Sequence, residues 1–464
     1  MNIGSQLAAF SKARAIVTRK HIPAIALALL LVAGVTTQGA DEVIGSEQDV
    51  SVGTQTALTL AQCIDIALKN NPEIARTGWD LQTSLAEMDI AKGERWPELH
   101  VVGGYSHFQE DRLIPPRRTG TIDALAFTDD LLRGSVVVSM PLYTGGRLRS
   151  QISAAEFLAQ SSEQRRMRTE TELVFNVSSV FYSMLGQREV INALIFSRKA
   201  LEQHHQKTLE LLKTKKAARV DSLRTAVRLA DIDQQLLRER NALDIRHFLL
   251  ASFLGLDQQE QPPRIDGELL LADIPADLDQ GLATALEQRQ DYQCAKSVVD
   301  AQQERVKIAQ AGRLPQVSAR ASYGNQWGLD SSESNEVGEV GVFVDFPLFE
   351  GGRIRAKITR ERSRLSAKRE VLRKLQLRIR LEVGTATSNI QSTLARIGVM
   401  EKAVEQASES LRIEREKYDL GRGTIIDVLD AQSALLTSQM NYHRALADYN
   451  TALAEFHLAT GHRG

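Results

Sequence analysis

The chain has 464 residues, with 57 lysines and arginines against 58 aspartates and glutamates, and this balance lacks the net basic face that nucleic-acid binding requires. Aromatic residues make up only 5 % of the chain, charged residues 25 %, and prolines number 11. This composition favours long uninterrupted helices over a compact α/β enzyme.

Residues 1–40 are typical of a secretory signal peptide. They contain four basic residues and no acidic one, followed by an apolar run from Ile22 to Val35 and then by small residues. The run is short for a membrane-spanning helix, although a single N-terminal anchor helix is the alternative interpretation. No cysteine follows the run, so we expect no lipid-modified N-terminus. We predict that the mature protein begins near residue 40 and is exported.

The remainder of the chain contains an internal duplication. Residues 67–74 align with 285–292, and the motif Pro-Leu-Tyr-Thr-Gly-Gly-Arg at 141–147 aligns with Pro-Leu-Phe-Glu-Gly-Gly-Arg at 347–353. The first copy is therefore twelve residues longer between these motifs, within a polar, proline-bearing stretch that predicts a loop. We place the copies at 58–257 and 281–461, with a linker over 258–280 that contains two consecutive prolines.

Each copy predicts the same order of elements: helix, strand, loop, strand, very long helix, turn and long helix. Strict alternation of apolar and polar residues predicts strands at about 99–109, 135–143, 316–327 and 339–348. Each strand is long enough to cross a bilayer when tilted. A soluble antiparallel sheet with one solvent-exposed face fits the alternation equally well. Four strands cannot close a membrane barrel, so strands from several chains would have to close one barrel together.

The predicted helices are too long for a globular domain. No proline interrupts the chain from Arg147 to Lys213, and such a helix would extend about 100 Å at 1.5 Å per residue. Its apolar residues recur at heptad spacing, which predicts that the helices pack side by side as coiled coils. The predicted seam is Leu173, Val177, Val180, Met184, Gln187, Ile191, Leu194, Arg198 and Leu201. At the short helices, Thr59 with Gln62 fits a capping box and Pro72 fits a first helical turn.

The sequence predicts no enzyme, no cofactor and no metal site. Neither a phosphate-binding loop nor a nucleophile elbow is present, and the adjacent His204 and His205 would point to different sides of a helix. The exported context permits a disulfide between Cys63 and Cys294, and their spacing leaves the pairing open.

Two motifs resemble the TolC family of outer-membrane efflux and secretion channel proteins. The first is Gly-Gly-Arg at 145–147 and 351–353, each time after strand–Pro–Leu–aromatic. The second, Tyr-Asp-Leu-Gly-Arg-Gly-Thr-Ile-Ile-Asp-Val-Leu-Asp-Ala-Gln at 418–432, resembles the family's periplasmic helix turn. The resemblance covers the chain from about Leu58 to Gly461 and includes the duplication.

The resemblance implies a mainly α fold with a membrane β-barrel, assembled as a homotrimer. Twelve strands would close one β-barrel in outer-membrane lipid, and twelve helices would continue it as an α-barrel tunnel through the periplasm. The far end would dock to a periplasmic adaptor (membrane fusion) protein carried by an inner-membrane transporter. Family members serve efflux or type I protein secretion, and the sequence leaves the substrate open.

The resemblance also assigns a periplasmic gate to Asp427, Asp430 and Tyr418. The two aspartates are three residues apart and share one face of a helix, so three chains would form a ring of six carboxylates that attracts cations. The alternative is an acidic pair that stabilises a helix start. For Tyr418 the alternative is packing in a coiled-coil seam. Gly423 departs from the family pattern, in which an arginine helps to hold the closed state.

The two helix turns are candidate docking tips for an adaptor. In the second copy the tip residues are Gly421, Arg422, Gly423 and Thr424, and in the first copy they are Lys215, Lys216 and Ala217. The first turn is strongly basic and the second is balanced, so they could present two different surfaces. The alternative is an ordinary solvated run of charge.

Two other classes of protein compete with the channel. A soluble periplasmic coiled-coil adaptor would have one helical hairpin beside a lipoyl-like β domain, which does not match the duplicated strand–loop–strand–helix order. An envelope hydrolase with a coiled-coil stalk would require a catalytic motif, which this chain lacks.

Overall fold

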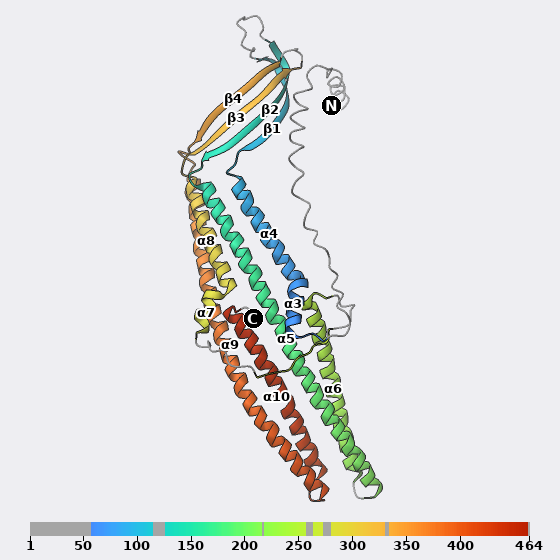
Figure 1. Cartoon of the computed structure of the whole chain (residues 1–464). Helices are drawn as coiled ribbons and strands as arrows, with labels where there is room; N and C mark the ends of the chain where they lie inside the picture. The colour runs from blue at the N-terminus through green and yellow to red at the C-terminus, as the bar shows by residue number, and fades with distance from the viewer. Residues whose placement is uncertain are drawn as a thin grey trace. The chain divides into compact units, whose positions relative to one another are not determined.

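The computed structural model describes residues 57–114, 126–215, 218–256, 263–271, 280–329 and 334–462, and all structural statements concern these residues. The predicted signal peptide lies outside the described residues, and so does most of the predicted loop between the first two strands. The described part is mainly helical, as expected. Its first copy contains α3 (Leu60–Asn70), α4 (Pro72–Gly93), β1 (Glu98–Ile114), β2 (Ala126–Tyr143), α5 (Arg147–Lys213) and α6 (Arg219–Leu254). Its second copy contains α7 (Gly281–Gln288), α8 (Gln290–Ala311), β3 (Gln316–Gly328), β4 (Ser334–Asp345), α9 (Arg353–Asp419) and α10 (Ile425–Thr460) (Figure 1).

The four strands form one antiparallel sheet in the order β1-β2-β3-β4, so the two copies meet at the β2–β3 pair. Val101 lies opposite Val136, Val136 opposite Tyr323, and Tyr323 opposite Gly338, which places the alternating apolar side chains on one face. Within the described chain, β1 and β4 each pair along one side only. The sheet therefore has two open edges.

Three strands differ in extent from their prediction. β1 continues to Ile114 and β2 starts already at Ala126, because backbone pairing does not require the alternating apolar side chains on which the prediction relied. β4 starts at Ser334 rather than near residue 339, because its first residues pair with β3 without the apolar alternation. It ends at Asp345 rather than near residue 348, since Pro347 has no N–H group to continue the ladder.

The predicted helix before each strand pair is in fact two helices. The capping box is confirmed: the Thr59 amide donates to Gln62 Oε1 (2.9 Å) and the Gln62 amide to Thr59 Oγ1 (3.4 Å). Pro72 occupies the first turn of α4, as predicted, directly after a break at Asn71. The second copy has the corresponding break at Arg289, between α7 and α8.

The end of the last helix of each copy packs against the break between that copy's two short helices. Gly255 and Gly461 end α6 and α10 with left-handed φ values of +67° and +80°. A Cβ atom on Gly255 would lie 2.5 Å from the Asn70 carbonyl oxygen, and one on Gly461 would lie 2.9 Å from Arg289 Cα. Only glycine fits this close backbone contact, which we call the helix-end joint.

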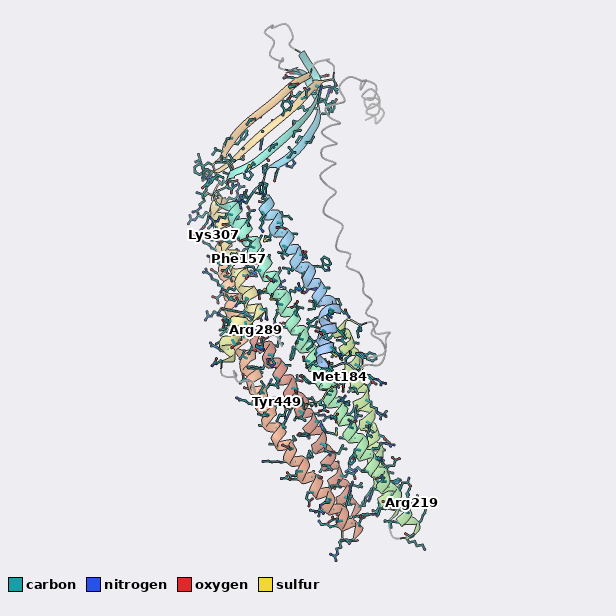
Figure 2. All side chains as sticks on the ribbon, in the orientation of Figure 1. Phe157, Met184, Arg219, Arg289, Lys307 and Tyr449 are labelled. Carbon is teal, nitrogen blue, oxygen red and sulfur yellow. The ribbon has the colours of Figure 1, made fainter. Side chains whose placement is uncertain are left out.

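The two joints use different side chains for the same purpose. In the first copy Asn71 Nδ2 donates to the Phe253 carbonyl (2.9 Å), and in the second Arg289 Nη1 donates to the Ala459 carbonyl (3.1 Å). Both bonds satisfy carbonyls that a helix end would otherwise leave unpaired. Arg289, which Figure 2 labels, is only 1 % exposed. Its charge is neutralised by ion pairs of 2.7 Å with Asp291 and Glu382.

The long helices pack along the predicted seams. α5 contacts α6, α9 contacts α10, and α5 also contacts α8 and α10 of the second copy, so the helices of the two copies join through α5 (Figure 1). Met184 and Tyr449 are among the fully buried seam residues. Arg198, predicted in the seam, is instead partly exposed and pairs with Asp233 (2.6 Å), because a guanidinium is not buried without full compensation.

Cys63 and Cys294 are free thiols in separate environments. Burial raises the pKa of the Cys63 thiol to about 11, while Cys294 Sγ lies 3.2 Å from Ser161 Oγ. Among the described helices, none is both long and apolar enough to cross a membrane.

We predict that Gly461→Ala destabilises the protein through the helix-end joint. Alanine would have to adopt a positive φ against the Arg289 backbone, at a cost of about 1–3 kcal/mol. Thermal unfolding followed by circular dichroism in detergent should show a lower midpoint. Gly384→Ala is the control, because this helical position of α9 has open space around it and should gain about 0.5–1 kcal/mol. Equal midpoints for the two variants would contradict the role of the joint.

Candidate functional site

The candidate gate and docking residues lie at the turns of the two helical hairpins, α5–α6 and α9–α10. These turns are at the ends of α5 and α9 opposite to the strands (Figure 1). Lys215 is in the first turn with a φ of +60°, whereas Lys216 and Ala217 lie outside the described residues. The turn of the second hairpin, Leu420 to Thr424, is described completely.

The second turn depends on both of its glycines. Gly421 adopts a φ of +72°, and the amides of Arg422 and Gly423 both donate to the Lys417 carbonyl (2.8 and 3.1 Å). Gly423 has no positive φ, but a Cβ there would lie 3.1 Å from Lys417 Cβ and 3.2 Å from the Tyr418 amide. The backbone geometry of the turn therefore accounts for both glycines of the tip. Arg422 is the charged residue that the turn exposes.

Asp427 acts in a reciprocal capping box with Thr424. The Thr424 amide and hydroxyl both donate to Asp427 Oδ2 (3.1 and 2.7 Å), and the Asp427 amide donates to Thr424 Oγ1 (3.3 Å). These hydrogen bonds hold the pKa of Asp427 below its usual range. The helix-start role, which the sequence left as the alternative, is thus present, and it keeps the carboxylate ionised.

Asp430 has a cationic neighbour on another helix. Arg228 Nη2 of α6 lies 3.3 Å from Asp430 Oδ1, and both side chains are exposed. Sequence reasoning missed Arg228, because 202 residues separate it from Asp430. Together, Asp427, Asp430 and Arg228 carry one net negative charge per chain rather than two.

Tyr418 lies between the two hairpins. Its ring packs with one buried cluster that contains Leu201 of α5 and with a second that contains Leu411 of α9. Burial and the nearby Asp221 carboxylate raise the pKa of Tyr418, and a hydrogen bond with Thr208 acts in the opposite direction. The seam-packing alternative for Tyr418 is therefore confirmed, and the seam in question joins the two copies.

His204 is a neighbour of Tyr418 that sequence reasoning did not connect to the gate. The two ring centroids are 5.4 Å apart, and His204 Nε2 is buried with no hydrogen-bond partner among the described residues. Burial, then Lys207 and Arg415, lower the pKa of His204, while Asp419 opposes this shift. Lys207 Nζ and Asp419 Oδ1, 2.7 Å apart, add an α5–α9 ion pair beside the ring contact.

An apolar groove runs between α6 and α10 beside the tips. Its volume is about 370 Å³, and charged side chains, among them Arg228 and Asp430, stand at its margin. Its apolar lining is Val220, Leu223, Val227, Ile426 and Leu429. Most of these side chains are exposed in the single chain, so the groove is a surface on which another helix could pack.

The chain matches the model of the family described as "Outer membrane efflux protein" over residues 63–256 and 281–462. The chain belongs to this family. The two matched segments correspond to the two halves of the described structure, and the resemblance to TolC drawn from the turn motifs is confirmed.

Curated relatives and solved structures agree with this membership. This outer membrane efflux protein is 20 % identical to "Outer membrane protein TolC" of Vibrio cholerae over 412 residues, which are 87 % of this chain and 91 % of the relative. It is 20 % identical to TolC of Escherichia coli over 85 % of this chain and 80 % of the relative. The crystal structure of VceC from Vibrio cholerae has the same fold, with a TM-score of 0.74 and 19 % identity over 87 % of this chain and 96 % of VceC.

We predict that acidification weakens the His204–Tyr418 contact between the hairpins. When the hairpins separate, His204 regains the ordinary histidine pKa of about 6.5, whereas its pKa is lower in the packed state. Below about pH 6.5 the separated state therefore binds more protons than the packed state. Packing is therefore fully stable above that value and loses stability as the pH falls. In His204→Gln, thermal midpoints at about pH 7.5 and about pH 5 should differ less than in the wild type. Gln203→Asn, an exposed neighbour on α5, is the control and should keep the wild-type difference. An unchanged difference in His204→Gln would exclude this effect.

Proposed function

We propose that this outer membrane efflux protein is the exit channel of a tripartite export system, assembled as a homotrimer. The open edges of β1 and β4 carry this proposal. Unpaired N–H and C=O groups cost several kcal/mol each in lipid, so a membrane-inserted sheet has to be closed by strands of other copies. Three copies of four strands make a twelve-stranded barrel, and three copies of the two hairpins would continue it as a tunnel of twelve helices.

The exposed apolar face of the sheet supports insertion in outer-membrane lipid. Val340 is 88 % exposed in the single chain, and Val342 and Val344 follow on the same face. A soluble sheet would present polar residues on an exposed face. The soluble-adaptor alternative is not favoured, because the family match covers both halves of the chain. The relatives to which the chain is similar are channel and efflux proteins rather than enzymes.

For the gate, we propose that Asp427 and Asp430 of three chains surround the periplasmic entrance. The capping box keeps Asp427 ionised, and Arg228 partly offsets Asp430. Such a ring would attract cations, and multivalent cations most, because several carboxylates can share one ion. Tyr418 would act here as the residue that holds the two hairpins together beside the entrance.

We predict that trivalent cations block the channel through these carboxylates. Added on the periplasmic side, they should lower planar-bilayer conductance of the wild type, and Asp427→Asn with Asp430→Asn should relieve the block. Asparagine removes the charge while keeping an acceptor for Thr424 and Arg228. Arg228→Gln should act in the opposite direction and lower the blocking concentration.

Asp221→Asn is the matched control for this experiment. Asp221 caps α6 through the Ala218 amide (3.3 Å) as Asp427 caps α10, but its copy has Arg224 where the second has Asp430. Its substitution should change the block much less. If the double variant were blocked like the wild type, the proposed gate would be rejected. If the wild type were a monomer in detergent and did not conduct in a bilayer, the proposed channel itself would be rejected.

For docking, we propose that the two tips and the α6–α10 groove receive the hairpin of a periplasmic adaptor, which an inner-membrane transporter carries. The groove offers apolar surface between helices, and Arg422 and Lys215 offer exposed charge at the turns. This combination suits a partner helix with an apolar stripe and acidic flanks.

We predict that Arg422→Glu reduces export without affecting assembly. Arg422 is exposed and contributes to the turn through its backbone amide, which glutamate retains, so trimer size and bilayer conductance should match the wild type. Cells that depend on this channel should accumulate its export substrates. Lys402→Glu, on α9 about 30 Å from the tip, is the control for charge reversal and should export normally. Normal export in Arg422→Glu would argue that the tip is only a connector.

A further inference from the structure

Three potential metal ligands meet near the loop ends of β1 and β2. His107, Asp129 and Asp130 each offer one ligand atom, and these atoms all lie within 4.8 Å of one another. His107 Nδ1 and Asp130 Oδ1 are 2.8 Å apart. We call these residues the His107 cluster. They lie at the end of the sheet away from α4 and α5, and thus far from the proposed gate.

An irregularity in the strand pairing accompanies this cluster. Neighbouring residues of a regular strand point to opposite faces, so Asp129 and Asp130 would normally diverge. The register shifts here: His107 lies opposite Asp130, but the next pair joins Arg112 to Thr128. β1 thus has more residues than β2 in this interval, and Asp129 lies opposite the bulge. Bulges redirect side chains, which accounts for the convergence of the two carboxylates.

Asp130 is held in position from both neighbouring strands. Its carbonyl oxygen accepts a hydrogen bond from the Leu329 amide (3.0 Å) beyond the end of β3. Its Oδ1 accepts one from the Tyr105 hydroxyl of β1. Metal-ligating carboxylates are generally oriented by such outer hydrogen bonds, and loss of one weakens metal affinity by about 10–100-fold. Tyr105 is therefore a positioning residue for the cluster.

The chemistry of the donors selects the kind of ion. One imidazole nitrogen with two carboxylates suits zinc and similar transition metals, whereas calcium takes six to eight oxygen ligands. With metal–ligand bonds of about 2.0–2.1 Å, the ligands of a tetrahedral zinc lie about 3.3 Å apart. The ligand atoms of the cluster, at most 4.8 Å apart, would have to approach one another by about 1.5 Å or less to reach this spacing. His107 is exposed, and a water molecule would supply the fourth ligand that a three-residue zinc site needs.

We infer that His107, Asp129 and Asp130 form a binding site for a divalent transition-metal ion, with Zn²⁺ as the reference ion. The bound ion would cross-link the ends of β1 and β2. The site's location on the outer side of the membrane rests on the proposed function, whereas its ability to bind metal does not. The competing interpretation is a simple hydrogen-bonded pair of His107 and Asp130.

Calorimetric titration of the detergent-extracted full chain with Zn²⁺ tests this inference. The titration uses the Asp427→Asn, Asp430→Asn background, so that the proposed carboxylate ring does not contribute. One Zn²⁺ should bind per chain. His107→Gln and Asp129→Asn should each weaken binding at least about tenfold, and Tyr105→Phe should also weaken it. Excess Mg²⁺ should not compete.

His100→Gln is the matched control. His100 lies on the same strand, and its Nε2 is 3.4 Å from Glu98 Oε2, but no third ligand joins this pair among the described residues. This variant should therefore bind Zn²⁺ as the parent does. Equal affinity in His107→Gln and His100→Gln, no binding at all, or equal competition by Mg²⁺ would overturn the inference. Bilayer conductance of the same preparations is a separate readout, so loss of the metal site and failure of the channel can be distinguished.

Discussion

The unpaired backbone along β1 and β4 is the constraint on which the proposed assembly depends. A four-stranded sheet satisfies its inner strands and leaves one side of each outer strand open. Side chains cannot repair this in lipid, because each backbone N–H and C=O requires its own partner. Closure by further copies of the same sheet satisfies all of them. The proposed homotrimer, with its twelve-stranded barrel and three pairs of hairpins beneath it, meets this requirement.

The helix-end joint solves the corresponding backbone problem inside each copy. The long return helices α6 and α10 end at Gly255 and Gly461, and the breaks before Pro72 and Gln290 receive them. One copy satisfies a carbonyl near the helix end with a neutral Asn71. The other uses the buried Arg289, whose charge is compensated by the partly exposed carboxylates of Asp291 and Glu382. The backbone arrangement is thus shared, while its side-chain solution has diverged.

At the tips, structural roles and the proposed gate roles fall on the same residues. Asp427 caps its helix, and the capping hydrogen bonds lower the pKa of its carboxyl group, which suits a charged entrance. Tyr418 packs in a seam, and that seam is the contact between the two hairpins. For these two residues the structural and the gate interpretations are therefore compatible, since a residue that holds the hairpins together also controls how far they can separate.

The sequence by itself determined the duplication, the strand faces, the long helices and the first capping box, because each depends on residues that are near one another in the chain. Thr59 with Gln62 and the alternation around Val340 needed no tertiary information. Tertiary structure alone decided the contacts between distant segments. Arg228 beside Asp430, His204 beside Tyr418, and the convergence of His107 with Asp129 and Asp130 depend on helix packing and on one strand bulge. Local patterns determine which element forms and which face is apolar, whereas pairing across elements depends on register and rotation, which no local pattern encodes.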